Sequence, residues 1–163
     1  MRKQKGFSLI ELLIVVAIIL IIAAIAIPNL MRSKMAANEA SAVASTRTLV
    51  TAQATYNTSY QSYADTLVEL GPAPAAGATS AAAGLIDGVL SAAIKGSTGK
   101  SGYTFDLQAT PAVGAETAFT IQTAPTNAGK TGNRNFCTDE SGVVHFAIQP
   151  TACDLTVTTN ALQ

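Results

Sequence analysis

Residues 7–27 read FSLIELLIVVAIILIIAAIAI, a stretch of 21 residues in which only Glu11 is charged. At about 1.5 Å per residue, a helix of this length is about 31 Å long, close to the roughly 30 Å hydrocarbon core of a bilayer. The preceding hexapeptide MRKQKG carries Arg2, Lys3 and Lys5 and no acid. Because Lys and Arg favour the cytoplasmic side, this leader is expected to stay there while the rest of the chain crosses the membrane. The stretch therefore predicts one membrane-spanning helix.

The composition of the chain argues against several classes of function. Its 163 residues carry ten basic and ten acidic side chains, so no net charge attracts it to nucleic acid. Aromatic residues make up 6 %, Trp is absent and His145 is the only histidine. We expect His145 to be an ordinary strand residue, because no Cys, Asp or His stands at ligand spacing from it. No cofactor, metal site or catalytic residue is predicted, and the chain is not expected to be an enzyme.

An ordinary signal peptide or signal anchor is one interpretation of this N-terminus. Residues 24–26, Ala-Ile-Ala, imitate a small-residue cleavage site, but Ile27 and Pro28 follow them. Two features favour a different interpretation: Gly6 stands before the apolar run, and Glu11 places a carboxylate inside it. Acids within a membrane are costly and are usually paired or functional. The partner of Glu11 is then expected to be a lipid headgroup, a proton or a group from another chain.

The run GFSLIELLIV, which starts at Gly6, resembles the class III signal peptide of type IV pilins. In that family a membrane-embedded prepilin peptidase cuts after the glycine on the cytoplasmic side and methylates the new N-terminal amine. The resemblance implies that Gly6 is the cleavage residue, Phe7 the N-methylated start and Glu11 the assembly glutamate. It also implies that Pro28 is the family's proline near the end of the hydrophobic helix half.

The chemistry of these positions is consistent with polymerisation. Cleavage after Gly6 creates an α-amino cation at Phe7, and Glu11 of one subunit can pair with the Phe7 amine of its neighbour. In a low-dielectric filament core such a pair is strong and an unpaired Glu11 is costly, so the pair sets the register between subunits. Pro28 has no N–H for the carbonyl of Ala24, which predicts a kink or a loosened helix there.

A second helix half is predicted beyond this proline, because residues 29–60 contain no Pro or Gly and are rich in Ala. Six of its apolar and aromatic residues, together with Tyr63 just beyond it, fall largely on helical spacing: Met35, Ala42, Leu49, Ala52, Tyr56, Tyr60 and Tyr63. This stripe predicts packing against a sheet. An aromatic electron path is the alternative, but the absence of aromatic residues between Phe7 and Tyr56 argues against a continuous one.

The rest of the chain predicts loops and a sheet. Residues 71–102 form a composition break in which we expect loops around a short helix from about Leu85 to Ile94. From Tyr103 the period becomes two, and YTFDL, AFTIQTA, RNFCTD and GVVHFAI predict four short antiparallel strands. The TDESG sequence at 138–142 predicts a hairpin turn. A sheet packed on the helical stripe makes the fold α+β, in agreement with the type IV pilin fold.

Two cysteines, Cys137 and Cys153, enclose about fifteen residues near the C-terminus. They should pair if this part of the chain lies outside the cytoplasm, and chain entropy then predicts about 3 kcal/mol of stabilisation. The resemblance implies the same pairing, since a C-terminal disulfide encloses the D-region of the family.

The resemblance implies a structural subunit of a type IV pilus that serves adhesion, surface motility or DNA uptake. Residues 1–6 would be the removed leader, residues 7–27 the transmembrane and assembly segment, and residues 28–163 the periplasmic or extracellular domain. The precursor would cross the inner membrane once and then enter an extracellular filament. Its implied partners are other copies in a helical homo-oligomer, the prepilin peptidase, and an inner-membrane assembly platform with separate ATPase motors.

Two alternatives stay open from the sequence. A pseudopilin of a type II secretion system shares the leader and Glu11, but the Cys pair favours a pilin, since the main secretion pseudopilin usually lacks it and carries a calcium site. A membrane-anchored periplasmic enzyme would need a catalytic constellation that the residues after Pro28 do not contain.

Overall fold

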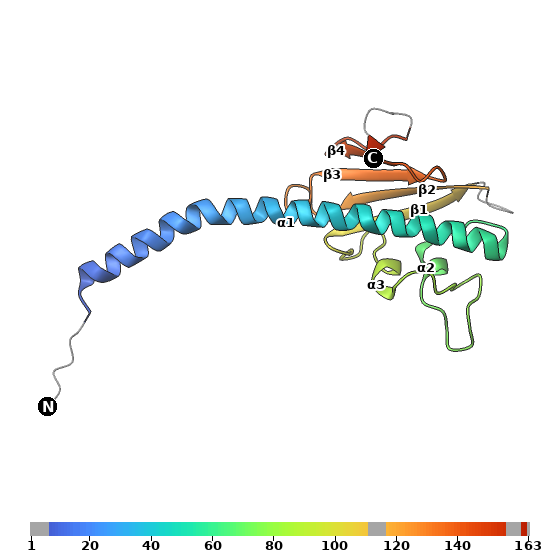
Figure 1. The fold of residues 1–163 in the computed structure, drawn as a ribbon, viewed down its shortest axis with the longest axis horizontal. Coiled ribbons are helices and arrows are strands. Elements are labelled where there is room, and N and C mark those ends of the chain that lie inside the picture. The colour runs from blue at the N-terminus through green and yellow to red at the C-terminus, as the bar shows by residue number, and fades with distance from the viewer. Residues whose placement is uncertain (1–6, 111–116, 156–160, 163) are drawn as a thin grey trace. The chain divides into compact units, whose positions relative to one another are not determined.

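The computed structural model describes residues 7–110, 117–155 and 161–162. It divides into two units, one ending at Lys34 and one beginning at Met35, and the second is called the head below. In the described residues three helices are followed by five strands: α1 Leu9–Tyr60, α2 Leu67–Leu70, α3 Gly88–Ser91, β1 Tyr103–Thr110, β2 Ala118–Pro125, β3 Arg134–Asp139, β4 Val144–Ile148 and β5 Ala161–Leu162. Figure 1 shows the course of the chain through them.

Helix α1 covers both predicted helical halves as one element of 52 residues, with Pro28 inside it. Isolated helices and ordinary domain helices are far shorter, usually about ten to fourteen residues. The helix ends where Gln61 adopts a left-handed conformation (φ 58°), and the Gln61 N–H donates to the carbonyl of Asn57 at 2.8 Å. A left-handed residue at this point is the usual way in which a helix stops.

The sheet of the head is an antiparallel meander in the order β1-β2-β3-β4-β5. The four predicted strands are present, and the turn between β3 and β4 has Gly142 at φ 73° with its N–H donating to the Asp139 carbonyl at 3.0 Å. The structure has one strand more than the four expected: β5 pairs with Val144 and His145 of β4. Two residues are too few to show an alternating pattern, so pairing alone defines this strand.

The helix predicted from about Leu85 to Ile94 is wrong in its extent. The helix found there, α3, has only the four residues Gly88–Ser91, and the carboxylate of its N-cap residue Asp87 accepts from the Leu90 N–H at 2.8 Å. The helix cannot continue because the Ala93 carbonyl accepts from the Phe105 N–H at 2.8 Å, which draws this segment onto β1. The single-turn helix α2 was not predicted.

The head core lies between α1 and the sheet, as the helical stripe predicts. Ala42, Leu49, Ala52 and Tyr56 are buried, while Met35, Tyr60 and Tyr63 of the stripe are partly buried. The core also takes large side chains from the sheet and from the segment between α1 and β1: Leu67, Leu70, Ile86, Leu90, Tyr103, Phe105, Phe119, Ile121, Phe136 and Val144.

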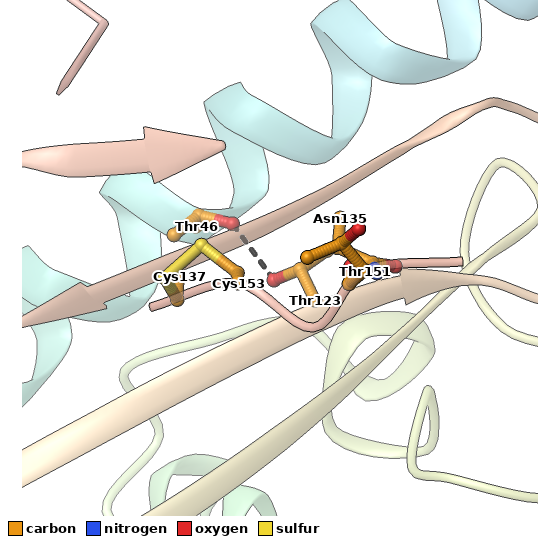
Figure 2. Close-up of a disulfide and its surroundings, with 6 residues drawn as sticks. All are labelled: Thr46, Thr123, Asn135, Cys137, Thr151 and Cys153. Carbon is orange, nitrogen blue, oxygen red and sulfur yellow. Dashed lines mark hydrogen bonds between the residues drawn. A yellow bond between two sulfur atoms is a disulfide. The ribbon is translucent and has the colours of Figure 1, made fainter. Parts of the chain in front are cut away.

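Three polar side chains of α1 are buried beside this stripe: Ser45, Thr46 and Gln53. The Gln53 side-chain amide makes a hydrogen bond with each backbone group of Ala64. It donates to the Ala64 carbonyl at 2.7 Å and accepts from the Ala64 N–H at 2.8 Å. The Thr46 hydroxyl donates to the Ala42 carbonyl at 3.0 Å and is hydrogen-bonded to the Thr123 hydroxyl of β2 at 3.1 Å (Figure 2). Buried polar groups are tolerated only when they are paired in this way.

A disulfide joins Cys137 of β3 to Cys153, with their Cα atoms 5.8 Å apart. Nearby, the Asn135 amide donates to the Thr151 carbonyl at 2.8 Å, so the segment after β4 is held to β3 at two neighbouring points (Figure 2). This is the cysteine pairing expected from the sequence.

Candidate assembly site

The first turn of α1 positions the carboxylate of Glu11. The helix begins at Leu9, which makes Ser8 the N-cap and Glu11 the third helical residue. The Ser8 N–H donates to Glu11 Oε2 at 3.3 Å. This is one half of a capping box, in which an acid at the third position satisfies an N–H that the helix itself leaves unpaired. The helix dipole also favours a negative charge in this turn.

The second carboxylate oxygen of Glu11 has no cationic partner in the described part of the chain. The ion pairs found there are Lys100 with Asp87 and Arg134 with Glu39. Phe7, two residues before the helix, is 81 % exposed, and Glu11 is exposed as well. The turn therefore exposes a carboxylate whose second oxygen has no cationic partner among the described residues, four residues after the expected mature N-terminus.

The surface around this turn is apolar. All fifteen large apolar side chains from Phe7 to Ile27 are exposed, by 45 to 81 %. The described residues contain one helix long and apolar enough to cross a membrane, and none of that apolar window is buried. Monomeric proteins in water rarely expose an apolar run of this kind, which is typical of a surface that lipid or another protein covers.

The remaining predicted site residues have different positions. Gly6 lies outside the described residues. Pro28 lies inside α1, and its missing N–H leaves the carbonyl of Ala24 without its usual helical donor; the loosening of the helix there stays a prediction. Cys137 and Cys153 belong to the head. Phe7 and Glu11 lie four residues apart at the start of α1, and their pairing between subunits stays a prediction.

The contact between the Ser8 N–H and the Glu11 carboxylate was not predicted from the sequence. The signal was present, because Ser8-Leu-Ile-Glu11 has the S-x-x-E spacing of a capping box ahead of an apolar run. Within the apolar run, the charge of Glu11 predicted a functional acid and not a contact at the start of the helix.

The described part of the head holds ionisable side chains in structural contacts. No three His, Cys, Asp or Glu side chains there gather closely enough to hold a metal ion. Burial and the nearby Glu39 carboxylate raise the pKa of Tyr103, and its hydroxyl donates to the Arg134 carbonyl at 3.0 Å. The Lys100 ammonium and the Leu90 N–H lower the pKa of Asp87. Both groups act in structural contacts.

Comparisons with known proteins concern mainly the N-terminal half. Residues 1–27 match the family described as the prokaryotic N-terminal methylation motif. The chain is 47 % identical over 74 residues to the type IV wide pilus major component PilA4 of Thermus thermophilus, an alignment that covers 44 % of this chain and 56 % of the relative. It is 43 % identical over 75 residues to the type IV major pilin protein PilA of Myxococcus xanthus, covering 46 % of this chain and 34 % of the relative. The chain thus spans about half the length of the first relative and a third of the second.

Proposed function

We propose that this chain, a member of the type IV pilin family, is a structural subunit that polymerises into an extracellular pilus. The observation that carries the proposal is the exposed apolar surface of residues 7–27, which contains a single carboxylate at the first turn of α1. The match to the N-terminal methylation motif and the two pilus subunits among the relatives support it. Both relatives are structural proteins by name, which agrees with a chain that has no enzymatic role.

Before assembly, lipid would cover the apolar surface. Residues 7–27 would cross the membrane once, residues 1–6 would stay in the cytoplasm, and residues 28–163 would be exported. In the fibre, the apolar helices of neighbouring subunits would replace the lipid around each other. The same side chains thus serve a membrane precursor and a filament core, and no refolding of the head is needed between them.

Processing would complete the assembly site. A prepilin peptidase would cut after Gly6 and methylate the amine of Phe7. The new cation would then pair with the Glu11 carboxylate of an adjacent subunit. One oxygen of Glu11 is engaged by the Ser8 N–H, so the turn holds the other in a defined direction for that amine. In an apolar core an unpaired Glu11 is costly, which selects the one register that pairs it.

Assembly requires partners beyond the chain itself. Extraction of an apolar helix from lipid opposes the hydrophobic effect, so an inner-membrane platform with separate ATPase motors would supply the work. The filament would serve adhesion, surface motility or DNA uptake.

Mass spectrometry of filaments sheared from cells tests this function. We expect a mature chain that begins at N-methyl-Phe7 and is two hydrogens lighter than the reduced chain because of the Cys137–Cys153 bond. Recovery of that chain only from the cell envelope, without fibres, would favour a secretion pseudopilin. A chain that still begins at Met1 in wild-type cells would contradict the processing step.

The role of Glu11 is tested by Glu11→Ala, with Glu140→Ala as the matched control. Glu140 is an exposed acid in the turn after β3, far from α1 residues 7–27 in sequence. We expect the first variant to accumulate as processed chain in the membrane with few or no fibres, and the control to assemble normally. Normal fibres from Glu11→Ala would rule out the pairing role.

A further inference from the structure

We propose that Asn38, Glu39 and Ser41 form a polar clamp that holds α1 to the head under load and confines any unwinding to residues before it. The clamp consists of these three side chains and the two loops that they contact, residues 99–102 and 127–134. The proposal rests on the proposed function only for the source of the load, which is tension along a pilus.

Asn38 and Glu39 hold the second of these loops. The Asn38 amide donates to the Thr131 carbonyl at 2.9 Å. Glu39 Oε1 accepts from the Asn133 N–H at 2.9 Å, and Glu39 Oε2 lies 3.6 Å from Arg134 Nε. The two hydrogen bonds connect residues 93 and 94 positions apart in the chain. They therefore join the helix to the loop before β3, much later in the chain.

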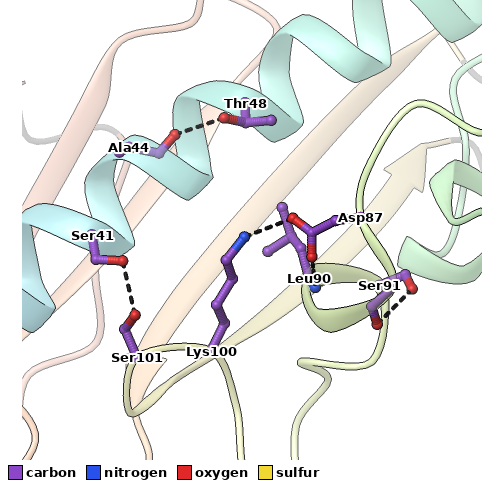
Figure 3. Close-up of polar contacts among 9 residues, drawn as sticks. Ser41, Ala44, Thr48, Asp87, Leu90, Ser91, Lys100 and Ser101 are labelled. Carbon is purple, nitrogen blue, oxygen red and sulfur yellow. Dashed lines mark hydrogen bonds and ion pairs between the residues drawn. The ribbon is translucent and has the colours of Figure 1, made fainter.

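Ser41 holds the first loop through its hydroxyl, which donates to the Ser101 hydroxyl at 3.0 Å (Figure 3). The two loops are also joined to each other, since the Thr126 N–H and hydroxyl, just before the second loop, both donate to the Gly102 carbonyl, at 2.9 and 3.1 Å. A force on one side chain of the clamp is thus shared by both loops.

Apolar packing is thin at the clamp. The first buried residue of α1 is Ala42, one residue beyond it. A hollow of about 290 Å³ opens beside Glu39, lined by Ala36, Glu39, Ala40, Val43, Arg134, Phe136 and Leu162. Residues 35–41 of α1 are partly or fully exposed, and none of them belongs to the hydrophobic core. The polar contacts hold the helix at this point.

The clamp also marks the end of the weakly held part of α1. The carbonyl of Ala24 lacks its helical donor at Pro28, so unwinding can begin there at low cost. In the described chain, the first α1 side chain that bonds to a loop of the head is Asn38. When the N-terminal end of α1 is pulled, the contacts between α1 and the rest of the head break in order from that end. The clamp is therefore the first contact to resist, and the buried stripe behind it is loaded only after the clamp opens.

Hydrogen exchange of the full-length chain in detergent micelles tests the clamp without requiring a filament. In Asn38→Ala/Glu39→Ala we expect the amides of residues 38–46 to exchange about tenfold faster or more, because three interactions are lost. Helix propensity alone predicts the opposite direction, since Ala favours a helix more than Asn does. Glu39→Gln retains an oxygen that can accept from Asn133 and is expected to keep most of the protection.

The matched control is Thr48→Ala/Thr51→Ala on the exposed side of the same helix. The Thr48 hydroxyl donates to the Ala44 carbonyl at 3.0 Å (Figure 3), and the Thr51 hydroxyl donates to the Arg47 carbonyl at 3.1 Å, so both bonds lie within α1. We expect this variant to leave the exchange of residues 38–46 unchanged. Unchanged or slower exchange in the clamp variant would overturn the proposal. A wild-type chain that never forms fibres would contradict the proposed function, but the hydrogen-exchange result would still decide whether the clamp exists.

Discussion

The hydroxyl of Tyr103 occupies the space beside Gly132 in which any other residue would place its Cβ. A Cβ built at Gly132 would lie 1.9 Å from the Tyr103 hydroxyl oxygen and 2.7 Å from the adjoining ring carbon. Tyr103 is fully buried, and its hydroxyl donates to the Arg134 carbonyl at 3.0 Å. The Tyr103 ring cannot move away without losing that hydrogen bond. The loop before β3 can therefore keep this conformation only with glycine at position 132.

Gly132→Ala is therefore expected to lower the free energy of unfolding by about 1–3 kcal/mol through overpacking. The measurement is chemical denaturation followed by circular dichroism. Gly88→Ala is the control, because a Cβ there would meet only Pro72 Cγ at an ordinary 3.5 Å. Gly88 begins α3, where Ala is neutral or slightly favourable. Equal stability of the two variants would contradict the packing argument.

The hydrogen bonds of the buried Gln53 amide are expected to contribute more to the free energy of unfolding than the volume of its side chain. Gln53→Met keeps a side chain of similar size but leaves the N–H and C=O of Ala64 without partners, at a cost of about 2–4 kcal/mol. Gln108→Met is the control, since that amide is exposed and donates only to Asp106 at 3.3 Å. Thermal denaturation of both variants measures the difference. A Gln53→Met variant as stable as wild type would show that water or a backbone shift replaces these bonds.

Removal of the disulfide by Cys137→Ser/Cys153→Ser is expected to cost about 3 kcal/mol, the chain-entropy value for a loop of about fifteen residues. A reducing agent should lower the melting temperature of the wild type by a similar amount. The same agent should leave the melting temperature of the double variant unchanged. If the wild type melts at the same temperature in oxidised and reduced form, the bridge contributes no stability to the head.

Acid is expected to weaken the contact between Asp87 and Lys100, 2.8 Å apart (Figure 3). The pKa of Asp87 is lowered from its ordinary 3.8 by the Lys100 ammonium and the Leu90 N–H. The stabilisation is therefore complete above the ordinary pKa and is lost as the pH falls through the lowered one. The effect is small, because the pair is largely exposed and solvent screens it.

The measurement for this pair is the melting temperature of the wild type and of Asp87→Asn as a function of pH. The difference between them should be constant near neutral pH and should shrink in acid. Lys100→Gln should remove most of the acid dependence that Asp87 contributes. A difference that grows as the pH falls would contradict the assigned direction of the pKa shift.

Much of the head was predictable because its signals are local. Alternation in the segments from Tyr103 onward identified four strands, and the TDESG sequence identified the turn at Gly142. The helical stripe through Leu49 and Tyr56 identified the buried face of α1. In each case, neighbouring residues in the sequence carry the information.

The errors fall where distant residues compete with local preference. Helix α3 stops early because the Ala93 carbonyl bonds to Phe105. Strand β5 exists only through its pairing with β4. Gln53 was not part of the predicted stripe, yet it is buried because the chain beyond α1 turns back and brings Ala64 to its amide.

The sequence by itself determined that residues 7–27 contain one long apolar helical segment. The length of an apolar run and the cost of a charge within it do not depend on the rest of the chain. The sequence also identified Glu11 as the unusual residue of that run. Only the tertiary structure decided how Asn38, Glu39 and Ser41 meet loops 60 to 94 residues away. Such contacts depend on the path of the whole head, and no local pattern of charge or hydropathy contains that path.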